Sequence, residues 1–226
     1  MNYHWDFSPV FANAALLAAG LGNTLKVTGI ALVCGLALGL LLALLRLSRH
    51  RWASWPAGFV IEVFRTTPPL VQLFWFFFAL PLIVGIEMTP FLAACVTFSI
   101  QSSAFFAEVF RAGIVSIERG QWDAARAIGM NHAQALRRIV LPQAVKRMIP
   151  AFMERVIELM KTTTLVATIS YADLLFEANE LSQKTFRPLE TYTVVALIYF
   201  FVIFVASLLA RRLELRLARS GESTVG

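Results

Sequence analysis

Cysteine and histidine are scarce in this chain of 226 residues, which contains two cysteines and three histidines. Cys34 and Cys95 both fall in apolar stretches, where a cysteine usually packs as a small hydrophobic residue. His4, His50 and His132 are scattered, without the spacing of metal ligands. We therefore predict neither a disulfide framework nor a metal site.

Charged residues are also few. They make up 15% of the chain, against 58% hydrophobic residues, whereas a typical soluble domain has roughly 25% charged and 45–50% apolar residues. This composition disfavours a water-soluble globule, and it excludes intrinsic disorder. The net charge of +6 indicates a basic surface, which we attribute to a membrane protein in contact with lipid and not to nucleic-acid binding.

Four long runs contain no charged residue at all, namely residues 27–45, 66–86, 88–107 and 191–210. A helix needs about 20 mainly apolar residues to cross a bilayer, so each run predicts a crossing. Residues 142–171 are interrupted by charges, yet their remainder is aliphatic or threonine at helical spacing, and we count them as a fifth, charge-bearing crossing. The prediction is an all-α membrane protein, one transmembrane domain over residues 1–226, with spans at about 22–47, 55–82, 88–114, 142–171 and 190–211.

The first 21 residues differ from these spans. Residues 9–20 form an apolar run that is too short to cross, and we expect Gly20 and Gly22 to end it. We predict that segment 1–21 lies along the outer interface. The stretch 1–7 lacks the positive charge of a cleavable signal peptide, so the first span is expected to act as the targeting signal.

The basic residues predict the orientation, because cytoplasmic loops collect lysine and arginine. Only Lys184 and Arg187 fall in connections on one side. The other connections hold Arg46, Arg49, Arg51, Arg111, Arg119, Arg126, Arg137, Arg138, Lys146, Arg147, Arg211, Arg212, Arg216 and Arg219. We therefore place the N-terminus outside, the C-terminus in the cytoplasm, and a long cytoplasmic loop between the third and fourth spans.

That loop, residues 118–142, contains a short helix-forming stretch. Gly120 opens it, Asp123 is expected in its first turn, where a negative charge suits the helix dipole, and Gly129 can close it in the left-handed conformation. Its middle residues, Ala124 and Ala125, are too small to build a core. One interpretation is a helix that inserts into a groove on another protein; the alternative is an ordinary amphipathic surface helix.

The spacing in this loop resembles the EAA loop of ATP-binding cassette (ABC) importer permeases. An acid followed by two alanines is followed by Gly six positions after the acid, Ile sixteen after it, and Leu-Pro at eighteen and nineteen. The resemblance implies that an ATPase contacts Arg119, Gly120, Asp123, Ala124, Ala125, Gly129, Ile139, Leu141 and Pro142. The family usually has Glu where Asp123 stands, so we expect that contact to be weakened or rearranged.

Other stretches are similar to one branch of that family, the polar amino acid uptake permeases, at residues 64–72, 107–114 and 161–165. The branch more often has Gly or Ser in place of Thr66 and Ser in place of Thr164. The resemblance implies the fold of a type I ABC importer permease in the bacterial inner membrane, paired with a second copy or a sister chain. An ATPase pair and an extracytoplasmic binding protein would complete the complex. Which amino acid it carries is left open.

The chain carries no Gly-x-x-x-x-Gly-Lys-Ser/Thr phosphate-binding motif. We therefore expect no cofactor on this chain, no enzymatic activity of its own, and ATP and Mg²⁺ on the separate ATPase.

Polar residues within the spans form a candidate substrate path, because a charge near the bilayer centre costs about 2.5 to 3.5 kcal/mol and is seldom idle. Arg147, Glu154, Glu158 and Lys161 fall on one helical stripe, with Arg155 about 100° away. Pro68 and Pro69 should kink their helix and free carbonyls for a substrate ammonium. The candidate path comprises Glu62, Arg65, Thr66, Gln72, Gln101, Glu108, Glu154, Glu158, Lys161 and Thr163. Structural ion pairs and interhelical hydrogen bonds are the alternative for any one of them.

Two other classes of function are alternatives. In an ion-gradient-driven secondary carrier, Glu108, Glu154 or Glu158 would relay the coupling ion, but such carriers usually show internal repeats, and none is evident here. An intramembrane enzyme would need a nucleophile or a metal constellation, and the sequence offers neither.

Overall fold

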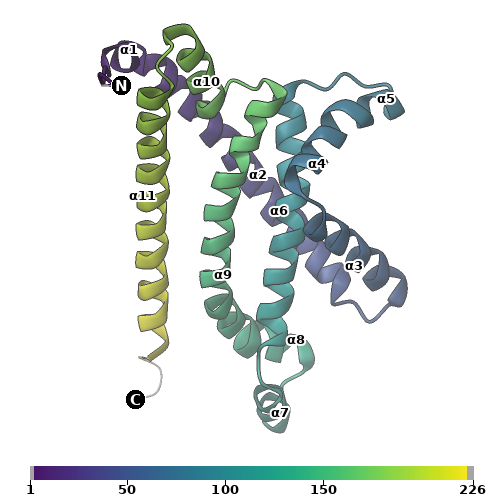
Figure 1. The fold of residues 1–226 in the computed structure, drawn as a ribbon. Coiled ribbons are helices and arrows are strands. Elements are labelled where there is room, and N and C mark those ends of the chain that lie inside the picture. Colours follow the sequence, from purple (N-terminus) through teal and green to yellow (C-terminus); the bar gives the residue numbers. More distant parts are fainter. Residues whose placement is uncertain (1–2, 223–226) are drawn as a thin grey trace.

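The computed structural model describes the backbone of residues 3–222 and the side chains of residues 3–212, and every regular element in that part is a helix (Figure 1). The elements are α1 (Ser8–Ala12), α2 (Ala14–Arg46), α3 (Arg51–Thr66), α4 (Pro69–Phe74), η1 (Trp75–Ala79), α5 (Leu80–Val84), α6 (Pro90–Val115), α7 (Arg119–Ala127), α8 (His132–Ala135), η2 (Leu136–Val140), α9 (Leu141–Thr162), η3 (Thr163–Ile169), α10 (Leu174–Thr185) and α11 (Pro188–Glu222). The predicted all-α class is confirmed. A helix satisfies its own backbone hydrogen bonds, which a segment surrounded by lipid must do.

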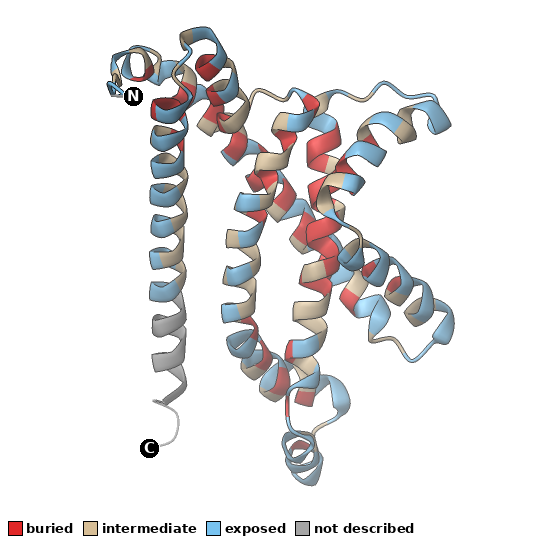
Figure 2. Ribbon diagram, in the orientation of Figure 1, coloured by how far each residue is buried: buried red, intermediate tan, exposed pale blue. Residues whose placement is uncertain are grey.

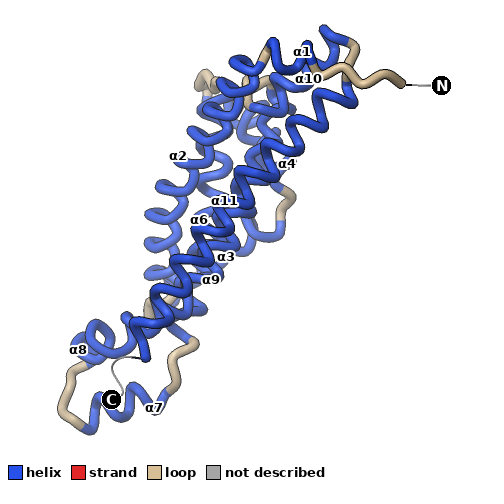
Figure 3. The backbone as a smooth tube through the Cα atoms, turned by 90° about the vertical axis from the view of Figure 1, so that its left-hand side faces the viewer, coloured by secondary structure: helices blue, strands red, loops and turns tan. Residues whose placement is uncertain are grey.

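The molecule is elongated, with different short helices at its two ends (Figure 3). Helices α1 and α10 lie at the end that carries the N-terminal segment, and α7 and α8 lie toward the opposite end, to which α11 runs (Figure 1). An odd number of crossings requires the two termini to lie on opposite sides. This arrangement is therefore consistent with the predicted orientation.

The core is the contact between α2 and α6, where buried residues concentrate (Figure 2). A Cβ added to Gly35 would lie 2.8 Å from the Cβ of Ser102, and one added to Gly39 would lie 2.8 Å from the Cβ of Phe106. Neither position can carry a side chain unless the helices separate. Small residues one turn apart let two helices approach closely, as is common within membranes.

The first long helix begins earlier than predicted. Helix α2 runs without a break past Gly20 and Gly22, so the expectation that these glycines end a helix is wrong. The reason for Gly20 is a close contact, because a Cβ there would lie 3.0 Å from the backbone oxygen of Asp173. Glycine at this position serves packing against the start of α10 and not chain termination.

The predicted second span is not kinked but broken into two helical arms at Thr67 and Pro68. The arms Arg51–Thr66 and Pro69–Val84 meet at an angle of 107°. The residue before the break, Thr67, is extended (φ −80°, ψ 134°), which is the conformation that a following proline imposes.

Residues 132–169 form one continuous helical rod, made of α8, η2, α9 and η3. It leads from the loop of residues 118–142 into the predicted fourth span, so the loop has no sharp end at residue 142. At its far end, Thr163 is fully buried and its hydroxyl lies 3.2 Å from the Thr28 hydroxyl of α2. The rod therefore joins the loop to the core of the molecule.

Among the described residues, three helices are long and apolar enough to cross a membrane, and the bent pair gives a fourth. The charge-bearing span predicted at residues 142–171 is helical but does not meet that criterion. Helix α10 was not predicted, although its N-cap Asp173 is the kind of residue that marks a helix start. Helix α11 extends beyond the predicted end at residue 211, and the predicted cytoplasmic residues Arg216 and Arg219 lie outside the described side chains.

Candidate functional site

The cytoplasmic helix expected from the sequence is present as α7. It ends through Gly129, which has a left-handed backbone (φ +78°) that suits glycine. The Gly129 N–H donates to the Arg126 carbonyl at 2.9 Å, and the Met130 N–H donates to the Ala125 carbonyl at 3.0 Å. The predicted closing role of Gly129 is confirmed.

The charges on α7 differ in detail from the prediction. The helix begins at Arg119, with Glu118 as the N-cap residue, and its first turn contains no acidic residue. Asp123 therefore lies beyond that turn, where it forms an ion pair with Arg126. Its carboxylate is held by a neighbour on the same helix and not by the helix dipole.

The two alanines of α7 face opposite environments. Ala125 is 1% exposed, whereas Ala124 is exposed. Beside them, Trp122 stacks on His132 of α8, with ring centroids 4.9 Å apart. Helix α7 thus leans on α8 and η2 through one face and leaves the Ala124 face open.

The residues that hold the loop are not those that the family pattern names. Leu136 and Trp122 pack against a small core that contains the fully buried Val140, whereas Ile139 is half-buried and Leu141 is 42% exposed. Of the predicted coupling residues, Pro142 and Gly120 are exposed as well. The buried apolar positions beside the motif therefore support the fold, and the exposed motif residues remain available to a partner.

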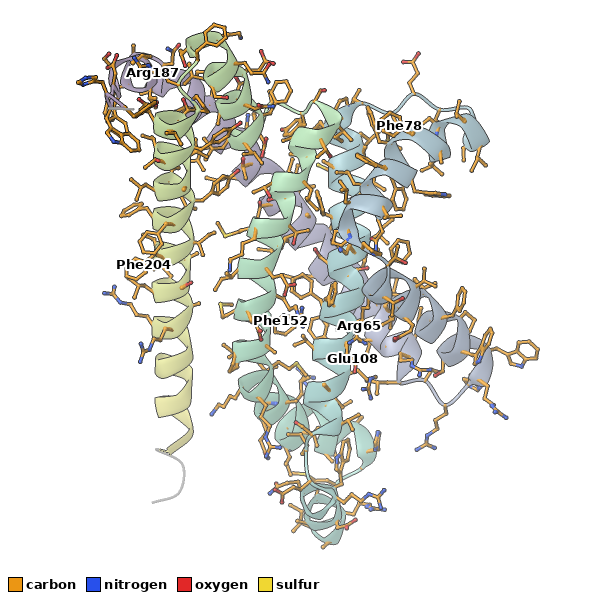
Figure 4. The ribbon with its side chains drawn as sticks, viewed as in Figure 1. Arg65, Phe78, Glu108, Phe152, Arg187 and Phe204 are labelled. Atoms are coloured by element: carbon orange, nitrogen blue, oxygen red, sulfur yellow. The ribbon has the colours of Figure 1, made fainter. Side chains whose placement is uncertain are left out.

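A second candidate site lies between the broken helix, α6 and α9, where two neighbouring cavities of 340 Å³ and 170 Å³ share Arg65, Phe105 and Arg155 in their walls. We call them together the arginine groove. Four residues of the predicted path line it: Arg65, Gln101, Glu108 and Glu158. Figure 4 shows Arg65 and Glu108 close to each other where α3 meets α6.

Arg155 was predicted to lie off the charged stripe, yet it is central to the groove. Its guanidinium donates to a Glu158 carboxylate oxygen at 2.8 Å and lies 4.7 Å from the centre of the Phe105 ring. Arg147 lines the larger cavity and donates to the Ser116 carbonyl at 2.5 Å. The only sign of this in the sequence is that an arginine stands within a predicted span. The side to which Arg155 points depends on the neighbouring helices, which helical periodicity does not describe.

The other path residues lie elsewhere. Glu154 and Lys161 border a separate hollow with Glu158, so the predicted stripe is divided between two surfaces. Thr66 donates to the Glu62 carbonyl within its own helix at 2.8 Å. Thr163 takes part in the contact with α2 described above.

Gln72 supports the proline break. Its side-chain amide donates to the carbonyls of Phe64 at 3.0 Å and Thr67 at 2.9 Å. The expectation that the break leaves carbonyls free for a substrate ammonium is therefore wrong for these two, because a side chain from the next helical arm satisfies them.

At the opposite end of the molecule, Asp173 caps α10 by accepting a hydrogen bond from the Phe176 N–H at 2.8 Å. Its second carboxylate oxygen is buried and has no hydrogen-bond partner among the described residues. Burial disfavours the charged form and raises the pKa of Asp173 to about 6.

The described residues contain no group of three or more side chains suited to hold a metal ion. What the geometry offers is a charged groove between helices and an exposed helix at one end. The first can receive a small zwitterion, and the second can receive a protein.

This chain is similar to known proteins over nearly its whole length. The family model described as "Binding-protein-dependent transport system inner membrane component" matches residues 35–219. The arginine transport system permease protein ArtQ of Bacillus subtilis (strain 168) is 34% identical over 212 residues, which are 94% of this chain and 97% of that protein. The glutamate/aspartate import permease protein GltK of Escherichia coli O157:H7 is 35% identical over 223 residues, which are 96% of this chain and 100% of that protein.

Solved structures show the same fold. A chain in the crystal structure of an amino acid ABC transporter with histidines superposes with a TM-score of 0.90 at 36% identity, covering 95% of this chain and 100% of that chain. A chain of the MetNI methionine ABC transporter in an inward-facing conformation superposes with a TM-score of 0.77 at 19% identity, covering 91% of this chain and 98% of that chain. The second likeness concerns the fold alone.

Proposed function

Because the chain belongs to the family of binding-protein-dependent transport system inner membrane components, we propose that it is the membrane permease subunit of an ATP-driven importer for a polar amino acid. The observation that carries this proposal is the full-length likeness to a chain of an amino acid ABC transporter. The relatives reported above are named as permeases for arginine and for glutamate/aspartate. Their names therefore support the class of substrate and leave its side chain undecided.

Energy for transport comes from a separate ATPase. The sequence has no phosphate-binding motif of its own, and α7 presents the exposed Ala124 at the end of the molecule where basic residues gather. Two such permease halves, each with its own α7, would contact a pair of ATPase subunits. An extracytoplasmic binding protein would deliver the amino acid at the end that carries α1 and α10.

The proposed topology has five crossings, with α9 as the fourth. Helix α9 is too polar to be recognised from hydropathy, but Arg155 and Glu158 face the arginine groove and pair with each other. Charged side chains inside a membrane protein characteristically face the bundle interior and pair in this way. With the bent pair as the second crossing, the N-terminus lies outside and α7 lies in the cytoplasm.

Closure of the ATPase pair on ATP would move α7. Because the loop passes directly into the rod of residues 132–169, this movement would tilt α9 and change the side from which the groove is open. The chain's own residues do no chemistry in this cycle. They bind the amino acid, exclude lipid and transmit displacement.

The test is transport by proteoliposomes that contain this chain, its second permease subunit and the ATPase. We expect uptake of a polar amino acid that requires ATP inside the vesicle and binding protein outside. Uptake by the permease alone under a proton or sodium gradient would contradict the proposal and support a secondary carrier. Labelling of a cysteine introduced at Arg119 with a membrane-impermeant reagent, in intact cells and in inverted vesicles, would test the side on which α7 lies.

A further inference from the structure

In the arginine groove, the Arg65 side chain has no hydrogen-bond partner among the described residues. It lines both cavities, its side chain is 34% exposed, and its closest acidic contact is the Glu62 carboxylate at 3.7 Å, which is too long for a hydrogen bond. The described residues offer it no other ion pair. A guanidinium carries five N–H donors in a planar fork that matches a carboxylate, so this group is ready to receive an anion.

Arg155 supplies a second cation across the groove. One of its nitrogens is bound to Glu158, and the Phe105 ring supports the face of its guanidinium. Stacking and the single ion pair fix the plane of this fork while leaving further donors unused. The groove therefore holds two oriented guanidinium groups that share the same walls.

The acids of the groove are already engaged. Glu108 accepts two hydrogen bonds from Arg111, at 2.9 Å and 2.5 Å, and Glu158 is bound to Arg155. Uncharged acceptors are nearby, since Gln101, Ser102 and Thr162 line the smaller cavity. The arginines lining the groove thus exceed the acids in number, and neither acid is free of an arginine.

Resting on the proposed function, we infer that the amino acid carried by this permease has an anionic side chain, and that Arg65 and Arg155 bind its two carboxylates. The substrate ammonium is then received by Glu158 or by the Gln101 side-chain oxygen. A cationic amino acid would need an acid for its side chain as well as for its ammonium, whereas both acids of the groove are paired with an arginine, and it would place its own charge against Arg65 and Arg155. Like charges brought close together repel each other, which disfavours such a ligand.

The experiment measures binding to the assembled complex in detergent without the binding protein, so that only the membrane part selects. Radiolabelled L-glutamate, L-glutamine and L-arginine are compared; glutamine has nearly the shape of glutamate but no side-chain charge. We expect glutamate to bind at least tenfold more tightly than the other two. Equal or tighter binding of glutamine or arginine overturns the inference, as does binding of none of them.

Variants then locate the selectivity. Arg65→Gln and Arg155→Gln should each weaken glutamate binding at least tenfold while glutamine binding changes little, and Arg65→Lys should recover part of the loss. Arg49→Gln is the matched control, since Arg49 lies in the exposed loop between α2 and α3. Recovery of each complex with its ATPase by size-exclusion chromatography confirms assembly. Unchanged glutamate affinity in both variants overturns the assignment.

This outcome is separable from failure of the proposed function. ATP-driven uptake of another amino acid by the same complex would retain the importer and reject the anionic substrate. Loss of ATP-dependent uptake for every amino acid would reject the importer itself.

Discussion

Small residues mark two helix surfaces in this protein, and the two differ in what lies opposite. On α2, Gly35 and Gly39 are buried, and α6 occupies the space that their side chains would need. On α7, Ala124 is exposed and no helix among the described residues covers it. The first surface is a completed contact within one chain. The second surface also has small residues, but no described helix packs on it. We therefore expect another protein to bind there.

The largest effect is expected from a larger side chain in the contact between α2 and α6. Gly39→Leu should prevent α2 and α6 from meeting, because even a Cβ would lie 2.8 Å from Phe106 and 2.9 Å from the Ser103 carbonyl. We expect a loss of about 3 kcal/mol of stability, the upper end of the usual cost of overpacking, seen as loss of the monodisperse peak in size-exclusion chromatography. Gly29→Leu is the control on the same helix, since nothing lies within 4 Å of a Cβ there. Equal behaviour of the two variants would refute the packing role of Gly39.

The next prediction concerns the end of α7. Gly129→Glu places a side chain at φ +78°, which costs about 1–2 kcal/mol for a residue other than glycine, and it adds a charge beside the exposed helix. We expect the permease to stay folded in the membrane while ATP-driven uptake falls at least tenfold. Gly85→Glu is the control, because Gly85 at the end of α5 also has a left-handed backbone (φ +71°) and open space around a Cβ, but it lies outside the loop that contains α7. Normal uptake by the Gly129→Glu variant would refute the role of α7 in coupling.

A finer prediction separates the two alanines. Ala124→Leu should leave the thermal stability of the isolated permease unchanged and reduce its recovery with the ATPase, because the side chain points away from the molecule. Ala125→Leu should lower the stability of the loop, because this position is 1% exposed and packs inside it. Thermal unfolding and co-purification are measured for both. If the two variants show the same loss of thermal stability and the same loss of co-purified ATPase, the distinction between the two alanines is wrong.

The smallest effect is expected from pH. The pKa of Asp173 is raised from 3.8 to about 6 in the folded chain, so the folded state holds its proton more tightly than the unfolded state. This contribution is fully present below the unfolded pKa and is lost as pH rises through about 6. The melting temperature should therefore fall by a few degrees between about pH 5 and about pH 7. Asp173→Asn should reduce that dependence while keeping the α10 cap, and an unchanged pH profile would contradict the assignment.

The features that could be predicted from the sequence are those that local chemistry determines. Charge-free runs predicted the long helices, Pro68 and Pro69 predicted the place where the second span changes direction, and Gly129 predicted the end of α7. The direction in which a side chain points across an interface could not be predicted in this way. Helical periodicity grouped Glu154 with Glu158 and set Arg155 apart, but the position of α6 decides which of them face the groove.

Gln72 illustrates the same limit. The sequence showed an amide in a membrane span and a pair of prolines nearby, and a substrate contact was a reasonable interpretation of both. Only the bend of 107° shows why the amide is there, since it brings the carbonyls of one arm within reach of the other. A polar residue near a helix break can stabilise that break by binding the carbonyls that it frees. This role cannot be recognised from the spacing of residues in the sequence.

The rod of residues 132–169 carries Arg155 and is fastened at its far end by the hydroxyls of Thr163 and Thr28. It is therefore arranged as a lever, which is anchored in the core at one end and which, in the proposed topology, reaches the cytoplasm at the other. Movement of the loop would displace the Arg155 guanidinium, which we assign to binding the amino acid. The affinity for the amino acid and the conformation of the ATPase would then change together, because one helix carries both the binding group and the contact with the ATPase.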